Sequence, residues 1–191
     1  MIKMPQIRTK RLILRPWQES DLPLFAIMNS DPKIMEYIPS GLQSAEESNQ
    51  YAQSIIEHFK KRGWGKWAVS EINGADFIGY IGLCYVDYEA PFTPAVEIGW
   101  RLAFDFWNKG YATEGALAAL KYAFETINLQ EVVAVTPQQN FRSIAVMKKI
   151  GMVHNEFDDF DHPKLPQDHE LHRMVLYRLN RSKWLESNGT K

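Results

Sequence analysis

Residues 96–115 read VEIGWRLAFDFWNKGYATEG, and this stretch contains the features that decide the fold. Residues 95–104 are mostly apolar, which predicts a strand, and residues 113–127 carry apolar side chains at helical spacing, which predicts a long helix. The turn between them places Lys109 and Gly110 shortly before the helix. A helix start offers unpaired backbone N–H groups and a partial positive charge, and glycine lets an anion approach closely. The turn is therefore a candidate phosphate site.

The rest of the chain is predicted to alternate between strands and helices. Helices are expected at 20–30, 44–63 and 140–150, and further strands at 11–15, 66–70, 77–86, 131–136 and 171–179. Asn73-Gly74 predicts a hairpin turn whose two central residues both have positive φ. This order predicts an α/β or α+β sheet with helices on both faces.

Length and composition limit the possible functions. A chain of 191 residues fits one domain, expected at 1–185, followed by a polar tail at 186–191 that is expected to fray. The 22 basic and 23 acidic residues give a net charge of −1, which disfavours nucleic acid as a partner. No apolar run approaches the roughly 20 residues that span a bilayer, so no membrane association is expected. Cys84 is single, no secretion signal is expected, and a cytoplasmic location follows.

Four sequence marks follow one another along the chain: Arg11–Pro16, Glu97–Trp100, Asn108–Ala112, and Asn140-x-x-Ser143 followed by Lys149–Met152. In this order they resemble the GNAT superfamily of acyl-CoA-dependent N-acetyltransferases. The closest resemblance is to the branch that includes the ribosomal-protein alanine N-acetyltransferases. The family's pyrophosphate loop reads Q/R-x-x-G-x-G/A, and Trp107 stands where Gln or Arg is usual. The Rossmann and Walker A patterns are missing.

The resemblance implies a GNAT-type mixed, mostly antiparallel central sheet with a splayed strand pair. It also implies acetyl-CoA as co-substrate, with no metal, and direct attack of an amine within a ternary complex. Asn140 and Ser143 would lie beside the thioester. The backbone of the strand before the loop would bind pantetheine, and the loop itself would bind pyrophosphate. The strand residues are Ile98, Gly99, Trp100, Arg101 and Leu102, and the loop residues are Trp107, Asn108, Lys109, Gly110, Tyr111, Ala112 and Thr113.

Acetyl transfer requires a neutral amine, a polarised thioester carbonyl and a proton for the leaving thiolate. Free α-amines and lysine amines have pKa values near roughly 8 and 10.4, so a base must act at neutral pH. Family members use carboxylates at the position of Glu97, which makes it the first candidate for the base. His154 and His172 are the alternatives. Ser143 is the candidate proton donor, since Phe141 cannot donate, and N–H groups near Ile98 would stabilise the oxyanion.

Several alternatives stay open at this stage. Gly110 can be an ordinary turn, Asn140 an ordinary N-cap, and Glu97 a surface strand residue paired with a cation. Glu114 would repel a phosphate unless it points away. The acidic segment 157–172 can attract a cationic amine or be a solvated loop, and its histidines match no zinc pattern.

The expected acceptor is a protein N-terminus or a small-molecule amine. The alternatives are an aminoglycoside-type acetyltransferase and a non-catalytic acyl-CoA-binding module. A homodimer is an expectation at the level of the family.

Overall fold

The computed structural model describes residues 5–188, and the chain forms two compact units. The first contains Met1–Cys84 and Gly99–Ala119, and the second contains Tyr85–Ile98 and Leu120–Lys191. Strand β5 (Val96–Leu102) and helix α4 (Tyr111–Lys121) contribute residues to both units. A single domain over 1–185 stays a prediction.

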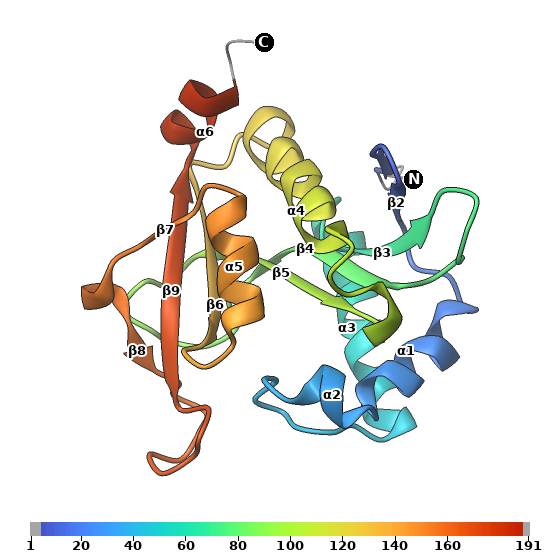
Figure 1. Cartoon of the computed structure of the whole chain (residues 1–191), viewed down its shortest axis with the longest axis horizontal. Helices are drawn as coiled ribbons and strands as arrows, with labels where there is room; N and C mark the ends of the chain where they lie inside the picture. The colour runs from blue at the N-terminus through green and yellow to red at the C-terminus, as the bar shows by residue number, and fades with distance from the viewer. Residues whose placement is uncertain (1–4, 189–191) are drawn as a thin grey trace. The chain divides into compact units, whose positions relative to one another are not determined.

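The first unit contains an antiparallel sheet whose strands follow one another in the order β1 to β5 (Figure 1). These strands are β1 (Ile7–Arg8), β2 (Leu12–Arg15), β3 (Lys66–Glu71), β4 (Gly79–Tyr85) and the end of β5. Leu14 lies opposite Val69, and Ala68 lies opposite Tyr80. Residues directly opposite each other on paired strands point to the same face, so Ala68 and Tyr80 share one face of this sheet.

Helices cover both faces of that sheet, as the sequence predicts. Helix α1 (Asp21–Asn29) and the first half of α3 (Ala45–Arg62) pack on the face of Ala68 and Tyr80 through Phe25 and Ala52. Helix α4 lies on the other face, where a Cβ on Gly115 would stand 2.3 Å from Ile81 Cδ1. The short helix α2 (Pro32–Met35) follows α1.

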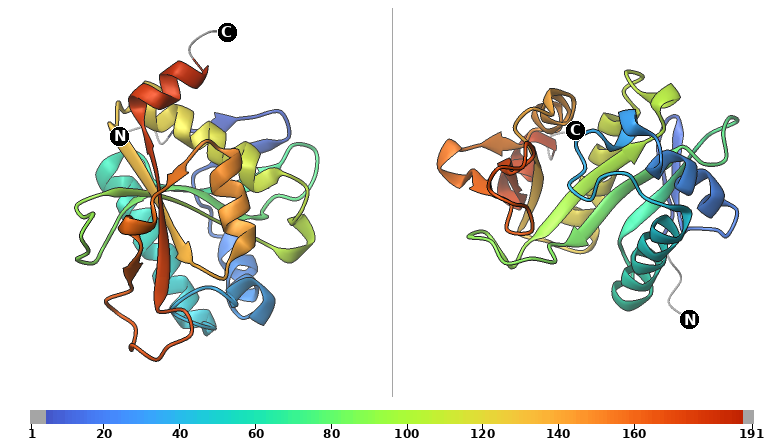
Figure 2. Two further views of the ribbon diagram at one scale, coloured as in Figure 1. Left: turned by 60° about the vertical axis from the view of Figure 1, so that its left-hand side comes forward. Right: turned by 90° about the horizontal axis from the view of Figure 1, so that it is seen from below.

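The second unit is built around the long antiparallel pair β6 (Glu131–Pro137) and β9 (Arg173–Asn180), seen from two sides in Figure 2. Strands β7 (Val153–His154) and β8 (Phe160–Asp161) also pair with β9 in antiparallel fashion. Strand β5 pairs with β6 in parallel, with Glu97 opposite Val133. The sheets are therefore mixed and mostly antiparallel, which confirms the predicted fold class. The splaying of a strand pair stays a prediction.

The remaining helices of the second unit follow its strands. Helix α5 (Phe141–Lys149) lies next to β6, and α6 (Arg181–Asn188) follows β9. Trp184 of α6 packs on Phe124 with ring centroids 5.7 Å apart. Residues 186–188 of the expected tail are thus helical, and residues 189–191 lie outside the described residues. A short 3-10 helix (Glu156–Asp158) lies between β7 and β8.

Two local predictions differ from the structure. The hairpin between β3 and β4 is confirmed, but only Asn73 has a positive φ, of 61°, and Gly74 does not, so the predicted turn type was wrong. Instead Glu71 closes a wider loop, because its backbone N–H donates to Ala75 O and its carboxylate accepts from Ala75 N. Helix α4 begins at Tyr111 and continues as a π-helical turn over Tyr122–Thr126. Among residues 5–188, no helix has the length and apolar character needed to cross a bilayer.

Candidate functional site

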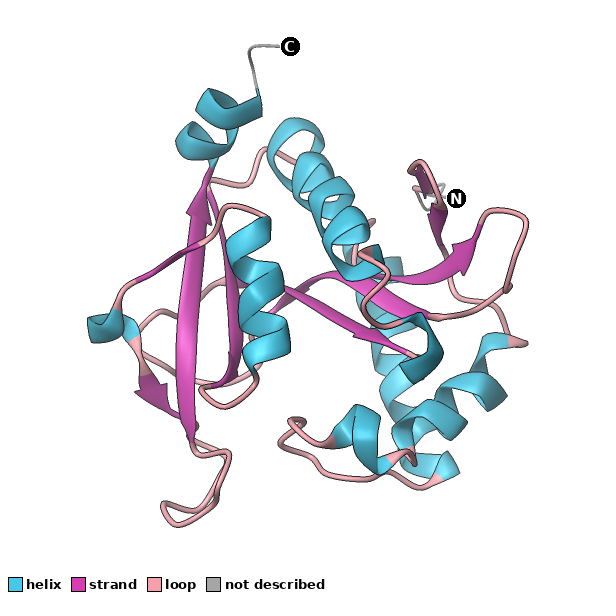
Figure 3. Cartoon of the chain, in the orientation of Figure 1, coloured by secondary structure: helices cyan, strands magenta, loops and turns pink. Residues whose placement is uncertain are grey.

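Figure 3 shows the loop that connects β5 to α4, and a hydrogen bond from the side chain of Trp107 helps to hold its shape. It contains a short 3-10 helix (Phe104–Phe106) and then Trp107, whose Nε1 donates to Leu102 O at 2.7 Å. The backbone turns sharply after this, because Asn108 and Gly110 have φ of 59° and 79°. Gly110 therefore occupies a left-handed position that disfavours a side chain.

The start of α4 presents backbone N–H groups that the chain leaves open. The first helical hydrogen bond runs from Glu114 N to Gly110 O at 3.0 Å. Within residues 5–188, no side chain accepts a hydrogen bond from the amides of Tyr111, Ala112 or Thr113. Lys109 extends beside them, with its Nζ 5.1 Å from the centre of the Phe106 ring. This arrangement can receive an anion.

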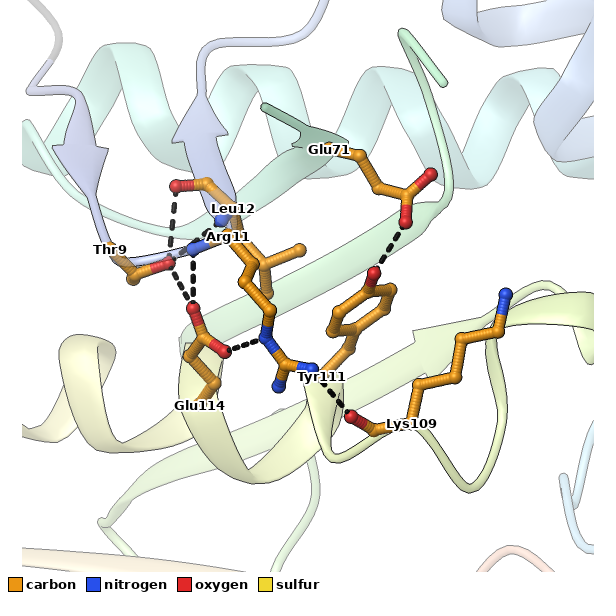
Figure 4. A network of polar contacts seen from close by, with 7 residues as sticks. All are labelled: Thr9, Arg11, Leu12, Glu71, Lys109, Tyr111 and Glu114. Carbon is orange, nitrogen blue, oxygen red and sulfur yellow. Dashed lines mark hydrogen bonds and ion pairs between the residues drawn. The ribbon is translucent and has the colours of Figure 1, made fainter. Parts of the chain in front are cut away.

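Arg11 joins β2 to this loop and to the first turn of α4 (Figure 4). Its Nε donates to Glu114 Oε2 at 2.7 Å, and its Nη1 donates to Lys109 O at 2.9 Å. Its guanidinium lies over the Tyr111 ring, 4.6 Å from the centroid. Glu114 Oε1 also accepts from Arg11 N at 2.8 Å and from Thr9 Oγ1 at 2.7 Å. The carboxylate of Glu114 is therefore turned toward Thr9 and Arg11.

These contacts set the charge of the helix start. Burial raises the pKa of Glu114, but the hydrogen bonds from Thr9 and Arg11 outweigh burial, so its pKa lies below the usual value. The hydrogen bond from the Tyr111 hydroxyl, 2.5 Å long, likewise lowers the pKa of Glu71. Both carboxylates therefore stay ionised, and each already accepts hydrogen bonds from neighbouring residues of the first unit.

The lowered pKa of Glu114 predicts an acid-sensitive contribution to stability. A carboxyl whose folded pKa is depressed stabilises the fold above its unfolded pKa, near about 4.3, and loses this effect as pH falls through the folded pKa. The free energy of unfolding should therefore fall below about pH 4. The free energy of unfolding of Glu114→Gln should be lower than that of the wild type at neutral pH and should fall less in acid. Urea titrations at several pH values measure it. Glu57→Gln, on the exposed side of α3, is the matched control. Identical acid profiles for wild type and Glu114→Gln would contradict the prediction.

The second unit contains the other predicted site residues. Glu97 lies on β5 and is partly exposed, and Ile98 beside it is buried. Asn140 caps α5 by accepting from Ser143 N at 3.2 Å. Its Nδ2 donates to Ser143 Oγ at 3.1 Å and to Thr136 Oγ1 at 3.0 Å. The Ser143 hydroxyl oxygen therefore accepts a hydrogen bond from the Asn140 side chain. As a result, the hydroxyl proton of Ser143 points away from Asn140.

The acidic segment 157–172 is largely paired within the second unit. Asp158 accepts from Arg178 Nε at 2.9 Å, and Asp161 accepts from Arg173 Nη1 at 3.2 Å. Asp159 lies 2.8 Å from His154 Nε2. Basic side chains thus compensate much of the charge that the sequence shows here. Among residues 5–188 there is no group of three or more His, Cys, Asp or Glu that could hold a metal ion.

Comparison with known proteins decides the family. Residues 11–153 match the acetyltransferase (GNAT) domain. The chain belongs to the GNAT acetyltransferase family.

Similar proteins cover nearly the whole chain. It is 32% identical over 178 residues to the uncharacterized N-acetyltransferase YnaD of Bacillus subtilis (strain 168), covering 93% of this chain and 98% of that protein. It is 32% identical over 189 residues to the FsC-acetyl coenzyme A-N(2)-transacetylase of Aspergillus fumigatus, covering 95% and 78%. The crystal structure of a GNAT family acetyltransferase from Bacillus anthracis aligns with a TM-score of 0.76 at 26% identity, covering 93% and 99%.

The matched domain and the names of the relatives show that the chain is an N-acetyltransferase. They favour this function over a non-catalytic acyl-CoA-binding module. In the first unit, the structure gathers the expected loop residues, from Trp107 to Thr113, at the start of α4. Glu97, Ile98, Asn140 and Ser143 belong to the second unit.

Sequence reasoning missed two features of the first unit. One is the contact between Arg11 and Glu114, although Arg11 begins one of the four marks of the family. The other is the side chain of Arg101, which was expected to act only as part of a backbone strand. This side chain is buried and bonded to Asn29, and the predicted role of the Arg101 backbone stays a prediction. The signal for the second was a charged residue between Trp100 and Leu102 in a mostly apolar strand.

Proposed function

We propose that the GNAT acetyltransferase moves an acetyl group from acetyl-CoA to a primary amine, either a protein N-terminus or a small molecule, by direct attack in a ternary complex. The observation that carries this proposal is the open start of α4, where three amides have no side-chain acceptor within residues 5–188. Glu114, the nearby carboxylate, is bonded to Thr9 and Arg11.

The residues of the loop fit the diphosphate of coenzyme A. The amides of Tyr111, Ala112 and Thr113 supply donors, and Lys109 supplies a positive charge. Gly110 has no Cβ, and Arg11 Nη2 lies 3.4 Å from where that Cβ would stand. The strand from Ile98 to Leu102 would hold the pantetheine arm through its backbone. Trp107 and Asn108 would shape the loop.

The chemistry assigned to the second unit follows from two side chains. Glu97 would take a proton from the acceptor amine, either directly or through water. Ser143 would donate its proton to the leaving thiolate. The hydrogen bond that Ser143 Oγ accepts from Asn140 supports this role, because it directs the hydroxyl proton away from Asn140. Asn140 would thus act through Ser143.

The chemical identity of the acceptor amine is a further part of this proposal. The relative from Aspergillus fumigatus is named for acetyl coenzyme A and for an N(2) position, which supports an amine acceptor. The sequence marks favour the ribosomal-protein alanine N-acetyltransferase branch, and an aminoglycoside-type amine is the alternative. A cytoplasmic location and a homodimer stay predictions.

Acetyl-CoA should protect the wild-type chain against thermal unfolding, and this protection should depend on Gly110. A ligand at about 100 times its Kd adds about 2.7 kcal/mol to stability. Gly110→Ala should raise the Kd for acetyl-CoA about tenfold, because its Cβ enters the path of the anion and strains the loop. The measurement is the shift in unfolding temperature across an acetyl-CoA titration.

Gly41→Ala is the matched control for this test. Gly41 also has a positive φ, of 66°, and a Cβ there would meet no atom within 4 Å. Both variants should lose similar stability from backbone strain, but only Gly110→Ala should lose affinity for acetyl-CoA. Equal protection of both variants by acetyl-CoA would exclude the loop as the diphosphate site. In a separate assay, the release of free thiol with a panel of amines would identify the acceptor class.

A further inference from the structure

Arg101, near the end of β5, carries a buried charge without an acidic partner. The residue is 7% exposed, and its Nη1 donates to Asn29 Oδ1 at 2.5 Å. Its Nε is buried and has no hydrogen-bond partner among the described residues, 5–188. Among residues 5–188, no carboxylate forms an ion pair with it. Because arginine stays protonated and a buried charge is costly unless it is paired, this arrangement requires an explanation.

Aromatic rings surround the guanidinium but satisfy it only in part. Its central carbon lies 5.5 Å from the ring centroid of Tyr80, 5.6 Å from that of Tyr51 and 6.0 Å from that of Phe25. The ring faces attract the cation, but they are not acceptors comparable to a carboxylate. The Tyr51 and Tyr80 hydroxyl oxygens lie 3.3 Å apart, so this wall also offers hydroxyl groups beside the cation.

The surroundings of Arg101 are electropositive. Lys66 Nζ donates to the Tyr51 hydroxyl at 3.0 Å. Burial raises the pKa of Tyr51, but the positive charges of Lys66 and Arg101 outweigh burial and hold that pKa below its ordinary value. Burial raises the pKa of the neighbouring Tyr80 despite the same two charges, so Lys66 and Arg101 attract a negative charge here while burial opposes it.

Within residues 5–188 there is open space beside Gly99, on the strand that carries Arg101. Gly99 lies two residues before Arg101 on β5, so the two residues point to the same face of the strand. A Cβ built on Gly99 would meet no atom within 4 Å. The strand therefore leaves room on the face from which the Arg101 side chain extends.

We propose that Arg101, with Asn29, Tyr51 and Tyr80, forms a binding site for a carboxylate group of the acceptor substrate. A carboxylate has the planar pair of oxygens that a guanidinium binds through two parallel hydrogen bonds. The inference rests on the proposed function, because it makes the acceptor an amine that also carries a carboxylate. Phosphate is the competing anion, and the test includes it.

The test compares acids with their amides. The purified full chain is titrated, without acetyl-CoA, with the standard amino acids, with their carboxamides and with inorganic phosphate, and binding is followed by calorimetry. We expect at least one acid to bind about 10 to 100 times more tightly than its own amide, the usual effect of losing a charged hydrogen-bond pair. In Arg101→Met this ratio should fall close to one. No difference between acids and amides in the wild type, a difference that persists in Arg101→Met, or preference for phosphate would overturn the proposal.

Two further measurements separate binding from a structural role. Arg101→Lys keeps the charge and should keep a reduced preference for the acid, so the test does not depend on a single variant. Arg101→Met removes a buried charge but also leaves the buried Asn29 Oδ1 without its donor, so its unfolding temperature should stay close to that of the wild type. A large loss of stability together with an unchanged acid-to-amide ratio would make Arg101 a purely structural residue. Protection of the wild type by acetyl-CoA is measured in a separate experiment. Its absence would contradict the proposed function, whereas the comparison of acids with amides tests only the carboxylate site.

Discussion

Replacing Glu97 with glutamine is expected to lower kcat for amine acetylation by about 10²- to 10⁴-fold, the usual contribution of a general base. Glutamine keeps the size of the side chain but cannot take up a proton. The acceptor amine, with a pKa near about 8 for an N-terminus or about 10.4 for a lysine-like amine, is mostly protonated at neutral pH. The measurement is kcat across about pH 5.5–9.5, a range that includes the pKa of an N-terminal amine, from thiol release at saturating acetyl-CoA.

The pH profile decides whether Glu97 is the base. Glu131→Gln makes the same change of charge on β6 in the same unit, at a carboxylate that is ion-paired with Arg178, and should keep the wild-type profile. Unchanged kcat and profile in Glu97→Gln would remove Glu97 from the mechanism. A residual activity that titrates near about 6.5 would instead point to His154 or His172.

The features that the sequence predicted well depend on residues close together in the chain. Ser44 and Glu47 form the reciprocal capping box that begins α3, and Gly63 ends this helix with φ of 77°. Asn140 caps α5 as expected. Each of these signals lies within one helical turn, so local geometry is enough to interpret it.

The features that the sequence could not predict depend on distant partners or on small differences in hydrogen bonding. Arg11 and Glu114 are 103 positions apart, and their contact requires β2 to lie beside the start of α4. Arg101 was read as part of a strand, because no pattern shows that its side chain reaches Asn29 on α1. The π-helical turn at Tyr122–Thr126 also escaped prediction, because an apolar stripe does not distinguish it from an α-helix.

Arg11→Ala is expected to raise the KM for acetyl-CoA by about 10 to 100 times, with a much smaller change in kcat. The substitution removes the bonds from Arg11 Nε to Glu114 and from Arg11 Nη1 to Lys109 O. The carboxylate of Glu114 then loses its cation and repels a diphosphate at the helix start. Steady-state kinetics at a fixed amine concentration measure both constants. Arg8→Ala is the control, because Arg8 is exposed on β1 and carries the same charge.

The double variant Arg11→Ala/Glu114→Gln separates two ways in which Arg11 can act. If Arg11 works by neutralising Glu114, removing the carboxylate charge should restore most of the affinity for acetyl-CoA, and the two substitutions will be strongly non-additive. If the double variant stays as weak as Arg11→Ala, the lost bond to Lys109 and the position of the loop account for the effect. An unchanged KM in Arg11→Ala would contradict both explanations. In Arg11→Ala, Thr9 Oγ1 and the backbone N–H of residue 11 can still donate to Glu114 Oε1, so this single variant isolates the loss of the guanidinium.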